Sequence, residues 1–370
     1  MKKLSLSILL GRLSVVILSL ILFSCNQPKE TRGTGETSFG ASVIEGDLGL
    51  KIDSLLREET KIGFSGSVSV IVDNNPILTK GYGWSDSLKK TPITPMTKFY
   101  LASTTKGITG IAAVIAQNEG YLSLSKPIIN LDNDCPDFLA ESTLHELLTH
   151  QSGLTGKYKT FGFTSIYENM QYIYSIPSTE RGNFRYVGSG FWLSSALIEK
   201  STGMSYEGFV DSLVFKPLGM EYTGFWFEEE QQNPLSIAGK KSKFPPGEDE
   251  PNWGFRGSGG VVTNILDFQK MALALGNDSF LNEDSWDEVF GPHLHLGSIG
   301  VGYGWFTTTT DRGTTEVWSR GGESFGHNGA IRWFKDEGVK IVILTNCGQI
   351  EEGDYEANKT VSDKIESIIF

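Results

Sequence analysis

The feature that most constrains the fold is the presence of strand patterns near both ends of this 370-residue chain. Residues 64–86 contain three valines that alternate with small residues, followed by the turn sequence "DNNP", and this pattern predicts a β-hairpin. Residues 300–345 are again strand-like, and "KDEG" separates the last two apolar runs as a second hairpin. The sequence therefore predicts an α/β (α+β) fold, in which the two ends share an antiparallel sheet flanked by helices.

Helical patterns fill the rest of the chain. Apolar residues at helical spacing predict helices at 47–60, 103–118 and 355–370. The helix at 103–118 carries an apolar stripe, is closed by Gly120, and is expected to be buried. Shorter helical stretches among aromatic, Gly and Pro residues predict an inserted, mostly helical subdomain at roughly 130–250.

The first 24 residues have the features of a secretion signal, with three positive charges, no acid and an apolar run. That run, residues 13–23, spans roughly 11 residues against about 20 for a membrane-crossing helix, so a transmembrane anchor is less favoured. The ending "LFSC" resembles a bacterial lipobox, whose cysteine, here Cys25, becomes the lipidated first residue of the mature chain. The alternative is an ordinary cleavable signal with an incidental cysteine.

The predicted product is an exported lipoprotein, periplasmic or at the cell surface, held to a membrane by a lipid on Cys25. Residues 25–45 are polar and rich in Gly, Thr and Glu, which predicts a flexible tether before a folded domain at 46–370. The formal net charge is −12, so no nucleic-acid partner is expected. A disulfide between Cys135 and Cys347 is permitted in an oxidising compartment, but the sequence does not decide it.

Ser103 and Lys106 stand three residues apart at the start of the apolar helix. Positions three apart share a helix face, and the amino end of a helix favours developing negative charge. A lysine shielded from water holds its proton less strongly, so its amine can act as a base toward the hydroxyl. On these residues alone, a helix-capping Ser103 and a surface Lys106 remain an alternative. The same spacing occurs in two loop-like stretches, at Ser87 with Lys90 and at Ser123 with Lys126.

Three further motifs fit known chemistry less well. "GESFG" places Ser324 in the Gly-x-Ser-x-Gly pattern of α/β-hydrolases, but that fold needs an acid and a histidine well downstream, and only His327 follows. "HELLTH" puts His145 and His150 five residues apart, whereas the zinc-protease motif needs four. "GPHLHLG" has two more histidines without an acidic or cysteine ligand beside them. No metal or other cofactor is therefore expected.

Five stretches, taken together and in order, resemble the serine β-lactamase and penicillin-binding-protein superfamily. The closest branch is that of class C β-lactamases, D-alanyl-D-alanine carboxypeptidases and related esterases. The likeness runs from about residue 50 to the end, and it implies an α/β sandwich with an all-helical subdomain, so that 46–370 is a β-lactamase-like serine hydrolase domain. The stretches are "FYLASTTKGITG", "STLHELLTHQSGL", "FRYVGSGFWLSSALIEKSTG", "GSGGVVTNILDFQKMA" and "GHNGAIRWF".

Carried over to this sequence, the resemblance implies a role for each motif. Ser103 would be the nucleophile, Lys106 its base partner and Tyr186 the second proton carrier. The backbone N–H groups of Ser103 and Ala330 would form the oxyanion hole, where fixed donors meet the charge of the tetrahedral intermediate. The strand of the third motif, which would line the cleft, also contributes His327 and Gly329.

Two positions depart from the family pattern. The central triplet is Tyr-x-Asn in the family, but here it ends in Gly188, so the amide that holds a substrate side chain is missing. A literal Tyr-x-Asn at residues 167–169 lacks the flanking block and is taken as coincidence. The third motif begins with a histidine in place of the lysine of many β-lactamases, and a mostly neutral imidazole holds a carboxylate less firmly. Both departures argue against efficient β-lactam turnover.

The sequence thus predicts a serine hydrolase that acts through an acyl-enzyme on an ester or an amide. A D-amino-acid peptide or a small ester is the expected small-molecule or peptide substrate, and a β-lactam fits less well. The alternative, which Gly188 keeps open, is a non-hydrolysing penicillin-binding or sensing lipoprotein on the same scaffold.

Overall fold

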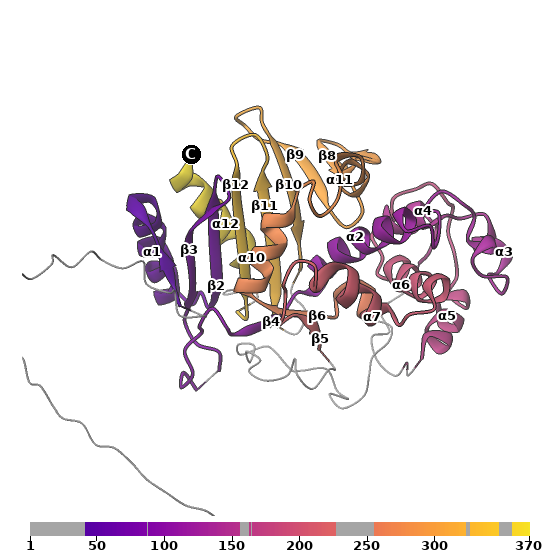
Figure 1. The fold of residues 1–370 in the computed structure, drawn as a ribbon, viewed down its shortest axis with the longest axis horizontal. Coiled ribbons are helices and arrows are strands. Elements are labelled where there is room, and N and C mark those ends of the chain that lie inside the picture. Colours follow the sequence, from indigo (N-terminus) through magenta and orange to yellow (C-terminus); the bar gives the residue numbers. More distant parts are fainter. Residues whose placement is uncertain are drawn as a thin grey trace, which may run out of the picture. The chain divides into compact units, whose positions relative to one another are not determined.

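A nine-stranded antiparallel sheet joins the two ends of the chain in the computed structural model, as the strand patterns predict (Figure 1). The structure describes residues 41–86, 88–155, 163, 165–226, 255–322, 326–347 and 357–370, and the unit that holds them runs from Phe39 to Phe370. The strand order is β1-β3-β2-β12-β11-β10-β9-β8-β7. The strands are β1 (Val43–Ile44), β2 (Gly66–Val72), β3 (Asn75–Tyr82), β7 (Leu294–Leu296), β8 (Ile299–Val301), β9 (Phe306–Thr309), β10 (Thr315–Arg320), β11 (Asn328–Phe334) and β12 (Val339–Thr345).

The predicted hairpin at 64–86 is confirmed in β2 and β3. Asp73 and Asn74 form its two-residue turn, both with positive φ (50° and 61°), which is the backbone that a type I′ hairpin turn requires. Asn and Asp tolerate this left-handed region better than most residues do. The last strand, β12, then pairs with β2 along its whole length, with Ile341 opposite Val70. This pairing brings the two ends of the chain into one sheet.

Helices cover both faces of this sheet. On one face, α1 (Gly46–Lys61) and α12 (Ala357–Ile369) pack together and bury Ile52, Leu56 and Val361 against β2, β3 and β12. On the other, α10 (Ile265–Ala274) lies across β2 and β12. No helix in the described ranges has the length and apolar character needed to cross a bilayer.

The middle of the chain is helical, as expected, and it packs around α2 (Thr105–Asn118), which is buried along almost its whole length. Residues 227–254, which belong to the predicted insertion, lie outside the described residues. The helical elements are η2 (Ile128–Asn130), α3 (Asp137–Ala140), α4 (Leu144–Leu148), α5 (Ile166–Tyr174), α6 (Ser189–Thr202), α7 (Tyr206–Val210), η3 (Asp211–Phe215), α9 (Arg256–Gly259) and α11 (Glu283–Phe290).

A second, three-stranded sheet leads into α2, and the sequence analysis did not predict it. Its order is β4-β6-β5, with β4 (Lys98–Tyr100), β5 (Gly224–Phe225) and β6 (Val261–Asn264). Strands of two to four residues are too short to show the alternation from which strands are predicted. The sheet matters for the site, because β4 ends at Tyr100, three residues before the candidate nucleophile Ser103.

The loop between β8 and β9 rests on the first turn of α2 through Gly304. Gly304 has φ +75°, and a Cβ there would lie 2.3 Å from the carbonyl carbon of Lys106. Ser319 fixes the loop from the other side by donating its hydroxyl to the carbonyl oxygen of Gly304 at 2.9 Å. The close approach holds the backbone of Lys106 in place.

We expect Gly304→Ala to lower the free energy of unfolding more than Gly313→Ala does. Gly313 has nearly the same φ, +77°, but open space around its missing Cβ, so alanine there should cost only the left-handed backbone, about 1–2 kcal/mol. At Gly304 the clash with Lys106 should add about 1–3 kcal/mol. Urea unfolding of both variants measures the difference, and equal losses would show that the loop does not rest on α2 as described.

Candidate active site

Ser103 lies in η1 (Ala102–Thr104), the short 3-10 turn that joins β4 to α2. Ala102 has φ 51°, a strained value for a residue with a side chain, which costs on the order of 1–3 kcal/mol and needs support from its surroundings. Thr104 supplies part of that support by donating its hydroxyl to the carbonyl oxygen of Gly329 on β11 at 2.8 Å. Ser103 is half-buried between buried neighbours, and it lines a small cavity.

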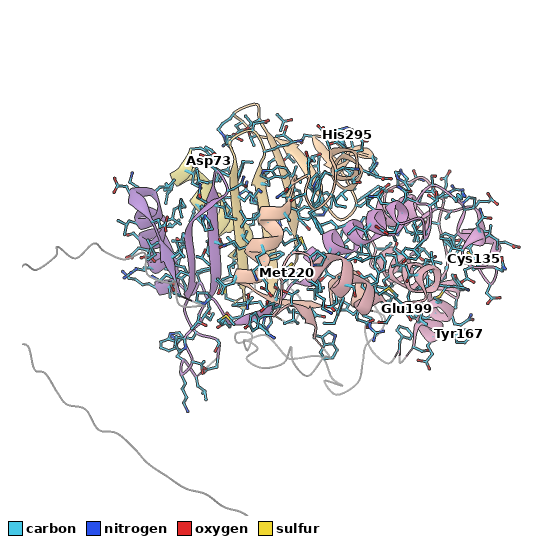
Figure 2. All side chains as sticks on the ribbon, viewed as in Figure 1. Asp73, Cys135, Tyr167, Glu199, Met220 and His295 are labelled. Carbon is cyan, nitrogen blue, oxygen red and sulfur yellow. The ribbon has the colours of Figure 1, made fainter. Side chains whose placement is uncertain are left out.

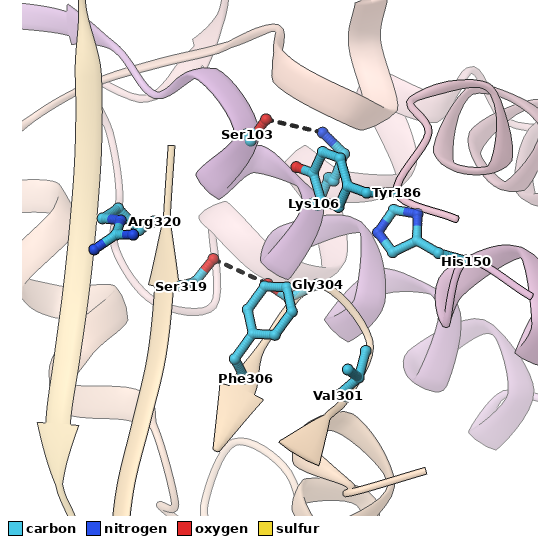
Figure 3. Close-up of a pocket in the computed structure, with 10 residues that line it drawn as sticks. Ser103, Lys106, His150, Tyr186, Val301, Gly304, Phe306, Ser319 and Arg320 are labelled. Atoms are coloured by element: carbon cyan, nitrogen blue, oxygen red, sulfur yellow. Dashed lines mark hydrogen bonds between the residues drawn. The ribbon is translucent and has the colours of Figure 1, made fainter. Parts of the chain in front are cut away.

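Lys106 is on the same face one turn along, and it is buried, with 2% of its surface exposed. Its Nζ donates to Ser103 Oγ at 3.0 Å (Figure 3). The same nitrogen donates to the carbonyl oxygen of Ser258 at 2.9 Å. Trp192 in turn holds Ser258 by donating its indole N–H to the hydroxyl at 2.7 Å. Lys106 forms no ion pair with any described residue. Its nitrogen is therefore directed at the serine by uncharged hydrogen-bond partners alone.

Tyr186 stands beside this pair, at the end of the loop that leads into α6. Its ring centroid lies 5.2 Å from Lys106 Nζ, and the side chain is half-exposed, so the phenol can meet both the lysine and a molecule arriving from solvent. Figure 3 shows the ring between Lys106 and His150. The sequence-predicted trio of Ser103, Lys106 and Tyr186 is thus brought together at one place.

His150 forms hydrogen bonds with the backbone on both sides of Tyr186. Its carbonyl oxygen accepts the N–H of Arg185 at 2.8 Å, and its Nδ1 accepts the N–H of Val187 at 3.2 Å. Its ring lies 4.5 Å from the ring of Tyr186, and His150 itself has φ 62°. Sequence reasoning assigned His150 only to a failed zinc motif. Its place within "STLHELLTHQSGL" was the signal that could have marked it.

The imidazole of His150 is uncharged. Burial is the main cause that lowers its pKa to about 3, and the neighbouring Lys106, when protonated, acts in the same direction. Because Nδ1 accepts a hydrogen bond, the ring proton is on Nε2. His150 therefore serves as a fixed acceptor throughout the neutral pH range, and not as a proton carrier.

The cavity at Ser103 is small, about 10 Å³, which is room for roughly one water molecule. Its walls include Lys106, Tyr186 and His150 together with two residues of the large sheet that the sequence analysis did not single out, Phe306 and Arg320. The bulk of any substrate must then lie beyond this cavity.

His327, which was expected to line the cleft, is buried instead. It is 1% exposed, its ring meets Phe99 edge-on at 6.2 Å, and it is not among the residues around the Ser103 cavity. Burial lowers the pKa of its imidazole to about 3, so the side chain is uncharged. Among the described residues, His327 is thus not part of the Ser103 cavity wall, and the predicted role in binding a carboxylate stays a prediction.

The predicted oxyanion role of Ala330 also needs correction. The carbonyl oxygen of Gly329 accepts the N–H of Gly321 at 2.9 Å, so it is directed at β10. In a trans peptide, the C=O of one residue and the N–H of the next residue point in opposite directions. The Ala330 N–H is therefore directed away from β10 and toward β12, where Ile343 is paired with Ala330. Gly329 itself contacts the nucleophile turn through Thr104, and Gly188, also predicted, is the buried N-cap of α6.

The remaining candidate motifs lie apart from Ser103 or outside the described residues. The "HELLTH" and "GPHLHLG" histidines pack together: His145 Nδ1 lies 2.7 Å from the Tyr303 hydroxyl, and His293 lies edge-on against His145. No group of three or more His, Cys, Asp or Glu residues that could hold a metal occurs in the described part of the chain. Ser324 and Cys25 are outside the described residues.

Two further predictions from the sequence concern the described cysteines and Tyr167. No disulfide joins the two described cysteines: Cys135 is buried beside α3, and Cys347 Sγ lies 3.1 Å from the hydroxyl of Thr345 (Figure 2). Tyr167, which opens the literal Tyr-x-Asn triplet, is 66% exposed on α5 and does not line the Ser103 cavity.

Comparisons with known proteins show which proteins this chain resembles in sequence and fold. PbpX of Bacillus subtilis (strain 168), a protein named as penicillin-binding, is 26% identical over 344 residues, 90% of this chain and 84% of its own length. Esterase EstB of Burkholderia gladioli is 27% identical over 376 residues, 84% of this chain and 92% of its own length. Among solved structures, the D-amino acid amidase from Ochrobactrum anthropi SV3 matches the fold with a TM-score of 0.73, at 20% identity, over 88% of this chain and 99% of that chain.

The family assignment follows from a match to a whole-domain family model. The Beta-lactamase model matches residues 52–363, a region that contains every described residue of the Ser103 cavity and all of the large sheet except β1. The chain therefore belongs to the Beta-lactamase family.

Proposed function

We propose that this protein is a serine hydrolase that cleaves an ester or an amide through an acyl-enzyme on Ser103. The observation that carries the proposal is the 3.0 Å contact between Lys106 Nζ and Ser103 Oγ, made in a buried place without a carboxylate partner for the lysine among the described residues. A structural lysine would be expected to pair with an acid or to reach solvent. A base needs direct contact with the hydroxyl whose proton it takes.

The proposed chemistry has two halves. In the first, Lys106 Nζ, as the neutral amine, takes the proton of Ser103, Oγ bonds to the substrate carbonyl carbon, and the leaving group departs with a proton delivered through Tyr186. In the second, water gives up a proton to the same groups, attacks the acyl carbon and releases Ser103. The N–H of Ser103 belongs to the first turn of a helix, where backbone donors have no partner within the helix, so it is a donor for the oxyanion.

The nature of the site favours esters and amides over β-lactams as substrates. Gly188 supplies no side-chain amide to hold an amide group of the substrate. Among relatives, one is named an esterase and one matching structure is a D-amino acid amidase, which supports small esters and D-aminoacyl compounds as the first substrates to try.

Intact-mass analysis after incubation with benzylpenicillin or a 4-nitrophenyl ester tests the proposal against a sensing role. A hydrolase gives free product and returns to its original mass. A sensor gives a lasting adduct, and a scaffold without chemistry gives neither. We expect turnover of the ester, and a lasting adduct with every acylating agent would favour the sensing lipoprotein.

We also propose that the protein is exported and anchored by a lipid on Cys25, because the first 25 residues combine basic residues, an apolar run and "LFSC". Cell fractionation of the full chain and of Cys25→Ala tests this. The full chain should remain with the membranes, whereas Cys25→Ala should be found in the soluble fraction. A membrane-bound Cys25→Ala protein would contradict the anchor.

A further inference from the structure

Three side chains that the proposed chemistry does not use pack together next to the wall of the Ser103 cavity. His145 lies on α4, His293 directly before β7, and Tyr303 in the loop between β8 and β9. We call these three residues the His-Tyr cluster. Its two histidines come from the "HELLTH" and "GPHLHLG" stretches, to which neither the sequence analysis nor the proposed reaction gives a role.

Tyr303 is the centre of the cluster, and its side chain is buried. Its hydroxyl lies 2.7 Å from His145 Nδ1, and its ring stacks on that of His293 with centroids 4.3 Å apart and planes at 18°. His293 Nε2 lies 2.8 Å from the carbonyl oxygen of Glu288 on α11, and because a carbonyl only accepts, this nitrogen carries the ring proton. Burial lowers the pKa of both imidazoles and raises the pKa of the phenol, so all three groups are uncharged at neutral pH.

The backbone of Tyr303 connects the cluster to the reacting residues. The neighbours of Tyr303 on both sides, Gly302 and Gly304, line the Ser103 cavity. The carbonyl oxygen of Tyr303 lies against Gly110 of α2, where a Cβ would overlap it. Neither Gly302 nor Gly304 has a side chain that could fix its place. The Tyr303 side chain is therefore the one that anchors this part of the cavity wall.

The segment from Leu144 to His150 contacts two different walls of the cavity. Near its start, His145 meets the hydroxyl of Tyr303, and at its end His150 bonds the backbone around Tyr186. Residues five apart point to different sides of a helical segment. The spacing that does not fit a zinc motif thus fits two separate contacts, one on each wall.

We propose that His145 is a positioning residue for the reaction at Ser103, because its hydrogen bond with the Tyr303 hydroxyl fixes the wall formed by Gly302 and Gly304. The inference rests on the proposed hydrolase function, since it concerns the same Ser103. Without His145, a buried hydroxyl is left without its partner, which favours a shift of the Tyr303 side chain. In a cavity with room for roughly one water, a wall displaced by about 1 Å can slow the reaction on the order of 100-fold.

A double-mutant cycle tests the proposal by kinetics. Tyr303→Phe removes the hydroxyl, and His145→Leu removes its partner but keeps a side chain of similar size. Each should lower kcat for 4-nitrophenyl acetate by about 10-fold, with KM changed by less than about 2-fold. The double variant should be about as slow as either single variant, because all three lack the same hydrogen bond. His145→Asn, which keeps a polar atom near the position of Nδ1, should recover most of kcat.

Tyr174 on α5 gives the matched control. Its hydroxyl donates to Asp132 at 2.5 Å, and neither residue lines the Ser103 cavity. Tyr174→Phe therefore removes a similar hydrogen bond elsewhere in the helical region, and it should lower the unfolding temperature and leave kcat unchanged. An equal loss of kcat in Tyr174→Phe would contradict the proposal, because it would show that kcat follows stability in general.

Hydrogen exchange tests the same contact without any need for activity. The N–H groups of Gly302 and Tyr303 donate to the carbonyl oxygens of Trp305 at 2.8 Å and Val289 at 2.9 Å. In His145→Leu and Tyr303→Phe, the peptide that contains these two amides should exchange at least about 5-fold faster than in the unchanged protein. Tyr174→Phe should leave its exchange unchanged.

The two experiments separate failure of the positioning role from failure of the hydrolase proposal. Ester turnover that is absent from the unchanged protein refutes the hydrolase, and exchange then still tests the contact. Turnover that is present, and is lost in Ser103→Ala, supports the hydrolase. In that case the positioning role is overturned if the folded single variants keep their kcat, if the losses multiply to about 100-fold in the double variant, or if exchange does not change.

Discussion

Lys106→Ala should lower the rate of acylation of Ser103 by a factor of about 100 to 10,000, the usual contribution of a positioned general base. The expectation follows from the 3.0 Å contact between Nζ and Oγ, which gives the serine its proton acceptor. His150, the nearest imidazole, cannot take over, because its pKa is lowered to about 3 and its Nδ1 is already occupied by the Val187 N–H.

Labelling by a fluorophosphonate probe, followed over time, measures the acylation rate. Lys216→Ala is the control, since Lys216 is a largely exposed lysine paired with Asp211. Lys106→Met, which keeps most of the buried volume, separates the loss of the amine from the loss of packing. Circular dichroism should show both Lys106 variants folded. Unchanged labelling in a folded Lys106 variant would remove the lysine from the mechanism.

His150→Ala should lower kcat by about 10-fold to 100-fold, although His150 carries no proton in the reaction. Its carbonyl oxygen and Nδ1 bond the backbone on either side of Tyr186, so their loss lets the phenol move, and a displacement of about 1 Å can cost on the order of 100-fold. Alanine removes the Nδ1 acceptor and also disfavours φ 62°.

His150→Asn is the variant that tests this positioning role. Asparagine tolerates the left-handed backbone and offers an amide oxygen as acceptor, so it should recover a large part of kcat. Both variants should leave the pH–rate profile between pH 5 and 9 unchanged in shape, since an imidazole with a pKa of about 3 does not titrate there. His295→Ala, at an exposed position on β7, is the control.

A purely structural His150 would give a different result. Alanine and asparagine would then lower the unfolding temperature and leave kcat per folded molecule unchanged. A new ionisation in the pH–rate profile of either variant would also contradict the account, because it would mean that the native imidazole takes part in proton transfer.

The sequence was sufficient to predict those parts of the structure that a local residue pattern decides. The two-residue turn at Asp73 and Asn74, the buried helix after Ser103 and the antiparallel sheet all follow from periodicity and turn chemistry, and the structure confirms them. The proximity of Ser103 and Lys106 also follows, since three residues on a helix share a face.

The sequence was insufficient to predict features that depend on the register between strands far apart in the chain. The direction of the Ala330 N–H depends on which strand Gly329 bonds, and no local pattern contains that information. The burial of His327 against Phe99 and the place of Arg320 in the wall of the Ser103 cavity depend on the same strand alignment. Motif spacing identified the candidate reacting residues, but it could not identify the groups that surround them.

The most direct test of the account is to locate the acyl group itself. The protein is mixed with a slowly hydrolysed acylating agent, quenched in acid, digested, and the modified peptide is sequenced by tandem mass spectrometry. We predict one adduct, on Ser103, and its absence from the Ser103→Ala protein. An adduct on Ser324, or ester turnover that persists without Ser103, would contradict the account.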